Sequence, residues 1–168
     1  MVKISSIRFR KLKMPEIEKI KPLWQGLMDD NFDKVAKRNP NLKEERKMIK
    51  NPWRDVKKYY SDNIKKGKGV IFVAEHNDEI IAHNFNLIKL NIPIFLPKEL
   101  GYIGELYVEK GYRSLGIGNR FRKMAFDWFK KKGIKRASIQ VMRDNPMAHK
   151  LYKRWGFHDF KIEMRKNL

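Results

Sequence analysis

The chain has 168 residues, of which 42% are apolar and 12% aromatic, which is enough for one globular domain with a sizeable core. It contains no cysteine, which excludes a disulfide framework, a thiolate metal site and a cysteine nucleophile. Its 39 Lys and Arg residues against 19 Asp and Glu residues give a formal net charge of +20, which concentrates anions near the surface.

The N-terminal part of the chain predicts one strand followed by two helices. Residues 2–9 form the expected strand, and the first helix begins near Pro15, because proline fits the first turn of a helix. A second helix is expected over residues 39–50. The apolar face of the first helix is expected to consist of Leu23, Trp24, Leu27 and Met28.

A third helix is delimited by its end residues. Asn51 is the expected N-cap, Pro52 occupies the first turn, and Gly67 ends the helix. The residues expected to face the core are Trp53, Val56, Tyr60 and Ile64. Residues 69–90 then predict a β-hairpin around Asn77 and Asp78, and residues 91–100 predict an apolar loop.

The second half of the chain alternates strands and helices. The expected elements are a strand at 101–108, a glycine-rich turn, a helix at 116–132, a strand at 135–142, a helix at 145–155 and a strand at 157–164. A strand–turn–helix–strand unit places its two strands parallel, with the turn at the edge where ligands bind. We therefore predict an α/β (α+β) fold: a single domain with a mixed central sheet flanked by helices.

The glycine-rich turn predicts an anion site. The first amides of a helix lack partners within it, so the amides of residues 115–119, with Gly116 and Gly118 between them, fit a phosphate or pyrophosphate. Arg113 and Arg120 add positive charge. Two glycines at such a turn also occur for conformational reasons alone, so this pattern by itself leaves both interpretations open.

One motif precedes the strand predicted at 135–142 and a second motif follows it. The first is R-x-x-G-x-G at Arg113, Gly116 and Gly118, and the second is N-x-x-A-x-x-L-Y-x-x-x-G-F from Asn145 to Phe157. Together they resemble the GNAT superfamily of acetyl-CoA-dependent N-acetyltransferases. The resemblance implies one N-acetyltransferase domain over residues 1–168, in which 1–99 build the acceptor site and 100–168 bind acetyl-CoA.

The resemblance also implies a set of positions that bind acetyl-CoA. The main chain of the strand would pair with the pantetheine arm, and the main chain of the turn would hold the pyrophosphate. Asn145 would hydrogen-bond the cofactor arm or simply cap its helix. Tyr152 would protonate the departing thiolate or simply pack on Trp155 or Phe157. These positions are Leu106, Tyr107, Val108, Arg113, Ser114, Leu115, Gly116, Ile117, Gly118, Asn119, Asn145 (the arm) and Tyr152 (the proton donor).

Glu105 is the candidate general base. Attack of an amine on a thioester needs a neutral amine, a polarised carbonyl and a proton for the sulfur, but no metal and no cysteine. Glu105 is the only acidic residue inside the apolar strand, and it shares a face with Tyr107 because side chains alternate along a strand. Its alternative interpretation is a strand-end charge paired with a lysine.

The acceptor is predicted to be a primary amine, either of a small molecule such as a polyamine or of a protein N-terminus or lysine. Three aspartates in the segment DDNFD fit a second ammonium group or, alternatively, a polar helix end. The sequence leaves the acceptor's identity and a homodimer open. The residues that the resemblance places around the acceptor are Trp24, Asp29, Asp30, Asp33, Tyr59, Tyr60, His83, Asn84 and Asn86.

Other partners are less favoured by the sequence. The four histidines form no paired metal-ligand motif, so we expect no metal. No stretch approaches the roughly 18 apolar residues of a membrane span and no secretory signal is present, so we expect a cytoplasmic protein without a membrane partner. The alternative function is a basic nucleic-acid-binding or regulatory protein on a GNAT-like scaffold, although no recognition module supports it.

Overall fold

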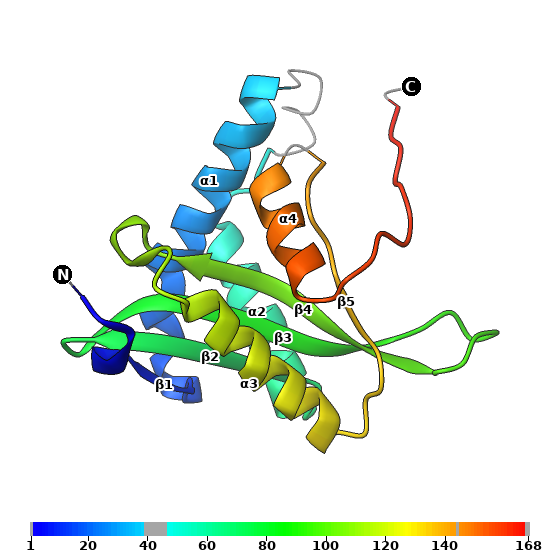
Figure 1. The fold of residues 1–168 in the computed structure, drawn as a ribbon, viewed down its shortest axis with the longest axis horizontal. Coiled ribbons are helices and arrows are strands. Elements are labelled where there is room, and N and C mark those ends of the chain that lie inside the picture. Colours follow the sequence, from blue (N-terminus) through cyan, green and yellow to red (C-terminus); the bar gives the residue numbers. More distant parts are fainter. Residues whose placement is uncertain (1, 39–46, 144, 167–168) are drawn as a thin grey trace.

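In the computed structural model, residues 2–38, 47–143 and 145–166 are described. Within these residues the core is one five-stranded sheet in the order β1-β2-β3-β4-β5, with helices on both faces (Figure 1). Strands β1, β2, β3 and β4 pair antiparallel in that order, and β5 is parallel to β4. The strands are β1 Arg8–Lys11, β2 Gly69–His76, β3 Glu79–Leu90, β4 Glu99–Val108 and β5 Ala137–Ile139. The helices are α1 Lys21–Arg38, α2 Pro52–Lys65, α3 Ile117–Lys131 and α4 Pro146–Arg154, with 3-10 turns η1 Ile4–Ser6, η2 Met14–Ile20 and η5 Lys110–Tyr112.

Two layers of helix cover the sheet. Helices α1 and α2 lie against one face and α3 against the other (Figure 1). On the first face Trp24, Trp53 and Tyr60 pack with Phe85 in one apolar cluster. On α3 the buried residues Ile117, Phe121, Ala125 and Phe129 recur every four residues and form the apolar face of this helix.

The predicted hairpin is confirmed. Strands β2 and β3 are joined by Asn77 and Asp78, whose φ angles are 50° and 62°. Positive φ at both central residues is the geometry of a two-residue hairpin turn, and Asn and Asp tolerate it better than most residues.

A β-bulge divides β4 into two parts with different neighbours. Residues Gly101–Ile103 pair with β5, which confirms the predicted parallel arrangement. On the other side Asn86 pairs with Ile103 while Phe85 pairs with Glu105, so Gly104 is an extra residue in the strand. Beyond the bulge, β4 continues to Val108 with only β3 beside it among the described residues. The edge of β4 that faces away from β3 is therefore open.

Two predictions for the first half need correction. The strand predicted at 2–9 is shorter and later, because Ser6 bonds the Lys3 carbonyl through both its amide and its hydroxyl and so forms a local turn. The helix predicted at 39–50 falls largely outside the described residues, and residues 47–50 are not helical.

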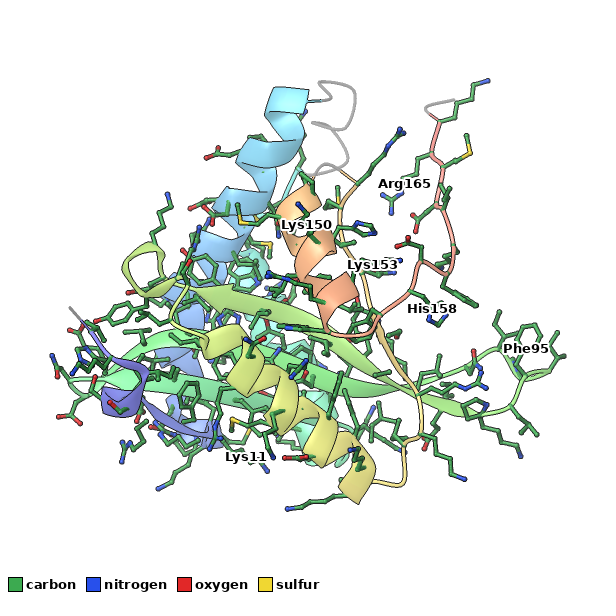
Figure 2. The ribbon with its side chains drawn as sticks, viewed as in Figure 1. Lys11, Phe95, Lys150, Lys153, His158 and Arg165 are labelled. Atoms are coloured by element: carbon green, nitrogen blue, oxygen red, sulfur yellow. The ribbon has the colours of Figure 1, made fainter. Side chains whose placement is uncertain are left out.

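The strand predicted at 157–164 is also wrong. This segment runs away from the sheet, with His158 and Arg165 along it (Figure 2), and it is tied to α4 where His149 and Lys153 donate to Asp159 at 2.6 and 3.1 Å. Its apolar residues alternate as in a strand, yet Phe160, Ile162 and Met164 are 88–90% exposed. A strand needs a neighbouring edge to pair with, and none of the described strands lies beside this segment.

Candidate active site

Glu105 lines a pocket of about 370 Å³ between α1, α2 and β4. The Tyr60 hydroxyl donates to its Oε2, and His83 Nε2 lies 3.3 Å from the same oxygen. The other oxygen, Oε1, has no hydrogen-bond partner among the described residues, and the Glu105 side chain is 21% exposed. The pocket walls include Trp24, Met28, Val56, Tyr59 and Tyr60. A carboxylate with one unpartnered oxygen thus meets an apolar pocket.

The bulge at Gly104 sets the direction of this carboxylate. Tyr102 packs on the α1–α2 face and Ile103 on the α3 face, so simple alternation would send Glu105 to the α3 face. The extra residue inverts the alternation, so the Glu105 side chain lies beside Tyr60. Leu106 instead packs against the apolar cluster that includes Ile117 and Phe121 of α3.

Tyr60 and His83 both contact the Oε2 atom of Glu105. Burial, together with the nearby Glu105 charge, raises the pKa of Tyr60, so its phenol keeps its proton and acts as a donor. His83 is fully buried, and its Nδ1 has no partner among the described residues. Because the carboxylate only accepts, Nε2 carries the ring proton, and His83 contributes to the site through Glu105 rather than as a wall of the pocket.

The turn before α3 is built around Gly116. Gly116 has a φ of 85° and Arg120 N donates to its carbonyl at 3.2 Å, so the amides of residues 117–119 lack partners within the helix. A Cβ on Gly118 would lie 3.5 Å from Trp155, so this position of the turn faces α4.

Arg113 is engaged by other parts of the protein. Its Nη2 donates to Asp30 at 2.6 Å, its Nε donates to the Val108 carbonyl at 2.9 Å, and its guanidinium lies 5.5 Å from the Tyr107 ring centre. These contacts join α1 to the end of β4. They also take Asp30, which the sequence placed near the acceptor, away from the Glu105 pocket.

Asn145 and Tyr152 of the α4 region make the contacts expected of a helix cap and of a packed ring, respectively. The Asn145 side chain accepts from Ala148 N at 3.3 Å and caps the helix. The Tyr152 ring packs on Trp155 and Phe157 with ring centres 5.4 and 6.5 Å away. Burial raises the pKa of Tyr152, so the hydroxyl is protonated near neutral pH, and it has no hydrogen-bond partner among the described residues. Such a phenol can still donate a proton.

Several expected acceptor residues lie outside the pocket. Asn84 and Asn86 are buried on the face of the sheet that α3 covers. They pair across β2 and β3 with Phe72 and Val70, which belong to the apolar cluster under α3. Asp29 accepts from Gln25, and Asp33 is exposed outside the pocket.

Two glycines that were not predicted to matter, Gly104 and Gly26, shape the candidate site. A glycine inside a strand or helix pattern signals a bulge or a close approach, and that signal was present at Gly104 and at Gly26. A Cβ on Gly26 would lie 2.5 Å from the Tyr107 hydroxyl oxygen, so this glycine lets α1 approach β4.

No cluster of three or more histidine and acidic side chains among the described residues is arranged to hold a metal ion. None of the helices in the described part of the chain combines the length and apolar character needed to cross a membrane.

Comparisons with known proteins indicate the family of the chain. The model of the acetyltransferase (GNAT) family matches residues 34–157, well over half of the chain. An uncharacterized N-acetyltransferase of Archaeoglobus fulgidus is 32% identical over 100 residues, which are 59% of this chain and 67% of that protein. One of Methanocaldococcus jannaschii is 29% identical over 107 residues, or 62% of this chain and 46% of that protein.

Solved structures share the whole fold. A predicted acetyltransferase from Clostridium acetobutylicum, solved with acetyl-CoA, has a TM-score of 0.70 at 21% identity and covers 96% of both chains. An aminoglycoside acetyltransferase from an uncultured soil metagenomic sample, in complex with trehalose, has a TM-score of 0.70 at 17% identity and covers 98% of both chains. The family match, its curated relatives and the shared fold agree, and the chain belongs to the GNAT family of acetyl-CoA-dependent N-acetyltransferases.

Proposed function

We propose that the protein transfers acetyl from acetyl-CoA to a primary amine by direct attack, with Glu105 as the base and Tyr152 as the acid. One observation carries the proposal. The Glu105 carboxylate, held at Oε2 by Tyr60, presents its unpartnered Oε1 to a pocket directly beside the open edge of β4.

The open edge and the α3 turn fit the co-substrate. Glu109 N donates to Ile81 O across the sheet, so by alternation the Tyr107 backbone also points to β3. The backbone groups of Leu106 and Val108 then point to the open edge, although the Val108 carbonyl already accepts from Arg113. These groups suit the pantetheine amides, and the first-turn amides of residues 117–119 suit the pyrophosphate.

The side chains supply the proton transfers that the reaction needs. Acetyl-CoA provides the reactive thioester. The Glu105 carboxylate takes a proton from the attacking amine, a carbon–nitrogen bond forms, and the carbon–sulfur bond breaks. The Tyr152 hydroxyl gives its proton to the sulfur, so the products are an amide and the free thiol.

The acceptor belongs to one of two chemical groups, a small-molecule amine or the N-terminus or lysine of a protein. A screen of both groups with acetyl-CoA, followed by thiol release and by the mass of the product, tests the activity directly. Acetylation of at least one amine is expected. If no amine is acetylated, the proposed activity is wrong.

Glu105→Gln tests the base. We expect its rate to fall by about a hundredfold or more at low pH, where the amine is protonated, and to recover partly at high pH, where free amine is abundant. The matched control is Glu99→Gln, on the same strand but paired with Lys68 outside the pocket. A deficit that is constant with pH, together with a lowered melting temperature, would show that Glu105 is structural.

A further inference from the structure

The walls of the Glu105 pocket indicate which amines it accepts, and this inference rests on the proposed function. Of the ten residues that line it, Glu105 and Asp55 are the only acids among the described residues. Trp24, Met28 and Val56 are among the rest, which are apolar or aromatic. We infer that the acceptor is a primary amine on an apolar carbon skeleton, with no second cationic group.

The rim of the pocket supports an apolar occupant. Met48 and Ile49 line the pocket and are 49% and 62% exposed, and Tyr59 beside them is 48% exposed. An apolar ligand would cover these side chains and remove their surface from water, which favours binding. Met28 and Met48 have unbranched side chains that adapt to ligands of different shape.

The nearby carboxylates already have partners within the protein. Asp30 is paired with Arg113, and Asp29 accepts from Gln25. Asp55, at the rim, is bonded to Arg54 at 2.9 Å. The sequence-based suggestion that the DDNFD aspartates hold a polyamine therefore lacks support in the structure. The net charge of +20 further disfavours polycations, because like charges repel.

A matched pair of substrates tests the inference on the full chain. Hexylamine and 1,6-diaminohexane have the same length and differ by one ammonium group. After correction for its two equivalent amines, we expect kcat/KM for 1,6-diaminohexane to be about tenfold lower, because its second charge must lie against an apolar wall or remain outside. Spermidine and an aminoglycoside are expected to be poorer still.

Peptide substrates distinguish a small-molecule amine from the N-terminus of a protein. Phenethylamine represents a free amine, and peptides that begin with Phe or with Lys represent a protein N-terminus. Preference for Phe over Lys supports the inference whichever source is faster. Equal or better use of 1,6-diaminohexane, spermidine, the aminoglycoside or the Lys peptide overturns it while the proposed function stands. No thiol release with any amine refutes both.

A pair of variants tests the role of the rim. Ile49→Asp adds a carboxylate beside the pocket at an exposed position, so we expect 1,6-diaminohexane to gain about two- to fivefold relative to hexylamine. Ile94→Asp is the control, because Ile94 is 81% exposed in the loop whose outer end carries Phe95 (Figure 2) and does not line the pocket. An equal change of the ratio in both variants would contradict the inference.

Discussion

Helix α1 passes β4 so closely that a side chain at position 26 would collide with Tyr107 unless one of them moved. A Cβ added to Gly26 would lie 2.5 Å from Tyr107 Oη and 2.8 Å from Tyr107 Cζ, distances that real Cβ atoms do not show. The ring or the helix must therefore move. Overpacking of this kind costs about 1–3 kcal/mol, whereas alanine gains about 0.5–1 kcal/mol over glycine inside a helix. We expect Gly26→Ala to destabilise the fold by on the order of 1 kcal/mol.

A double-mutant cycle separates the two contributions. In a Tyr107→Ala background the close contact is gone, so Gly26→Ala should stabilise the fold by about 0.5–1 kcal/mol. The sign of the effect thus reverses between the two backgrounds. Gly118→Ala is the control for a glycine with room, since its Cβ would lie 3.5 Å from Trp155, an ordinary contact.

Thermal unfolding at neutral pH measures all four forms of the cycle. For a chain of this length 1 kcal/mol corresponds to about 2–4 °C in Tm, so the reversal is well within reach. If Gly26→Ala changed Tm by the same amount and sign with and without Tyr107, the contact between α1 and β4 would not be the reason for the glycine. A lower turnover in Gly26→Ala is also expected, because Tyr107 shares its strand face with Glu105.

Three further predictions concern Tyr152 as the proposed acid, the ion pair of Arg10 with Glu16, and Gly116 in the turn before α3. Tyr152→Phe should lower turnover about a hundredfold and leave acetyl-CoA affinity by calorimetry unchanged; a change of less than twofold in turnover would assign the proton to another donor. The bond from Arg10 lowers the pKa of Glu16 from its ordinary value of 4.5 to about 2, so the stabilisation is complete above pH 4.5 and is lost as the pH falls towards 2. Glu16→Gln should therefore lower Tm at pH 7 and much less near pH 2, and an equal loss at both would contradict this. Gly116→Ala should lower Tm by about 2–4 °C through backbone strain alone, because φ is 85° and no atom lies within 4 Å of the added Cβ; Gly116→Asn should lose less, and equal losses would exclude strain as the cause.

Local patterns in the sequence predicted the local parts of the structure. Asn77 and Asp78 identified the hairpin, because their tolerance of positive φ is a property of single residues. The strand predicted at 157–164 failed because alternation shows only that a segment could pair, whereas pairing also requires a distant edge.

A related reason limits what the sequence could predict of the candidate site. Glu105 and the α3 turn are recognisable from residues near them in the chain. The partners that orient them are distant: Asp30 and Arg113 are 83 residues apart, and Tyr60 and Glu105 are 45 apart. Spacing could not show that Arg113 would be bound by Asp30 and not left free to meet an anion.

Gly104 links the fold to the chemistry of the site. The pairing of β5 with β4 ends at Ile103, and the extra residue in β4 follows at once. Because a bulge inverts the alternation of side chains, Glu105 is carried to the pocket face, where Tyr60 can donate to it. Because the β5 pairing stops at the same point, the backbone of Leu106 and Val108 is left open on the other edge. The proposed base and the open strand edge beside it therefore begin at the same point of β4, directly after Gly104.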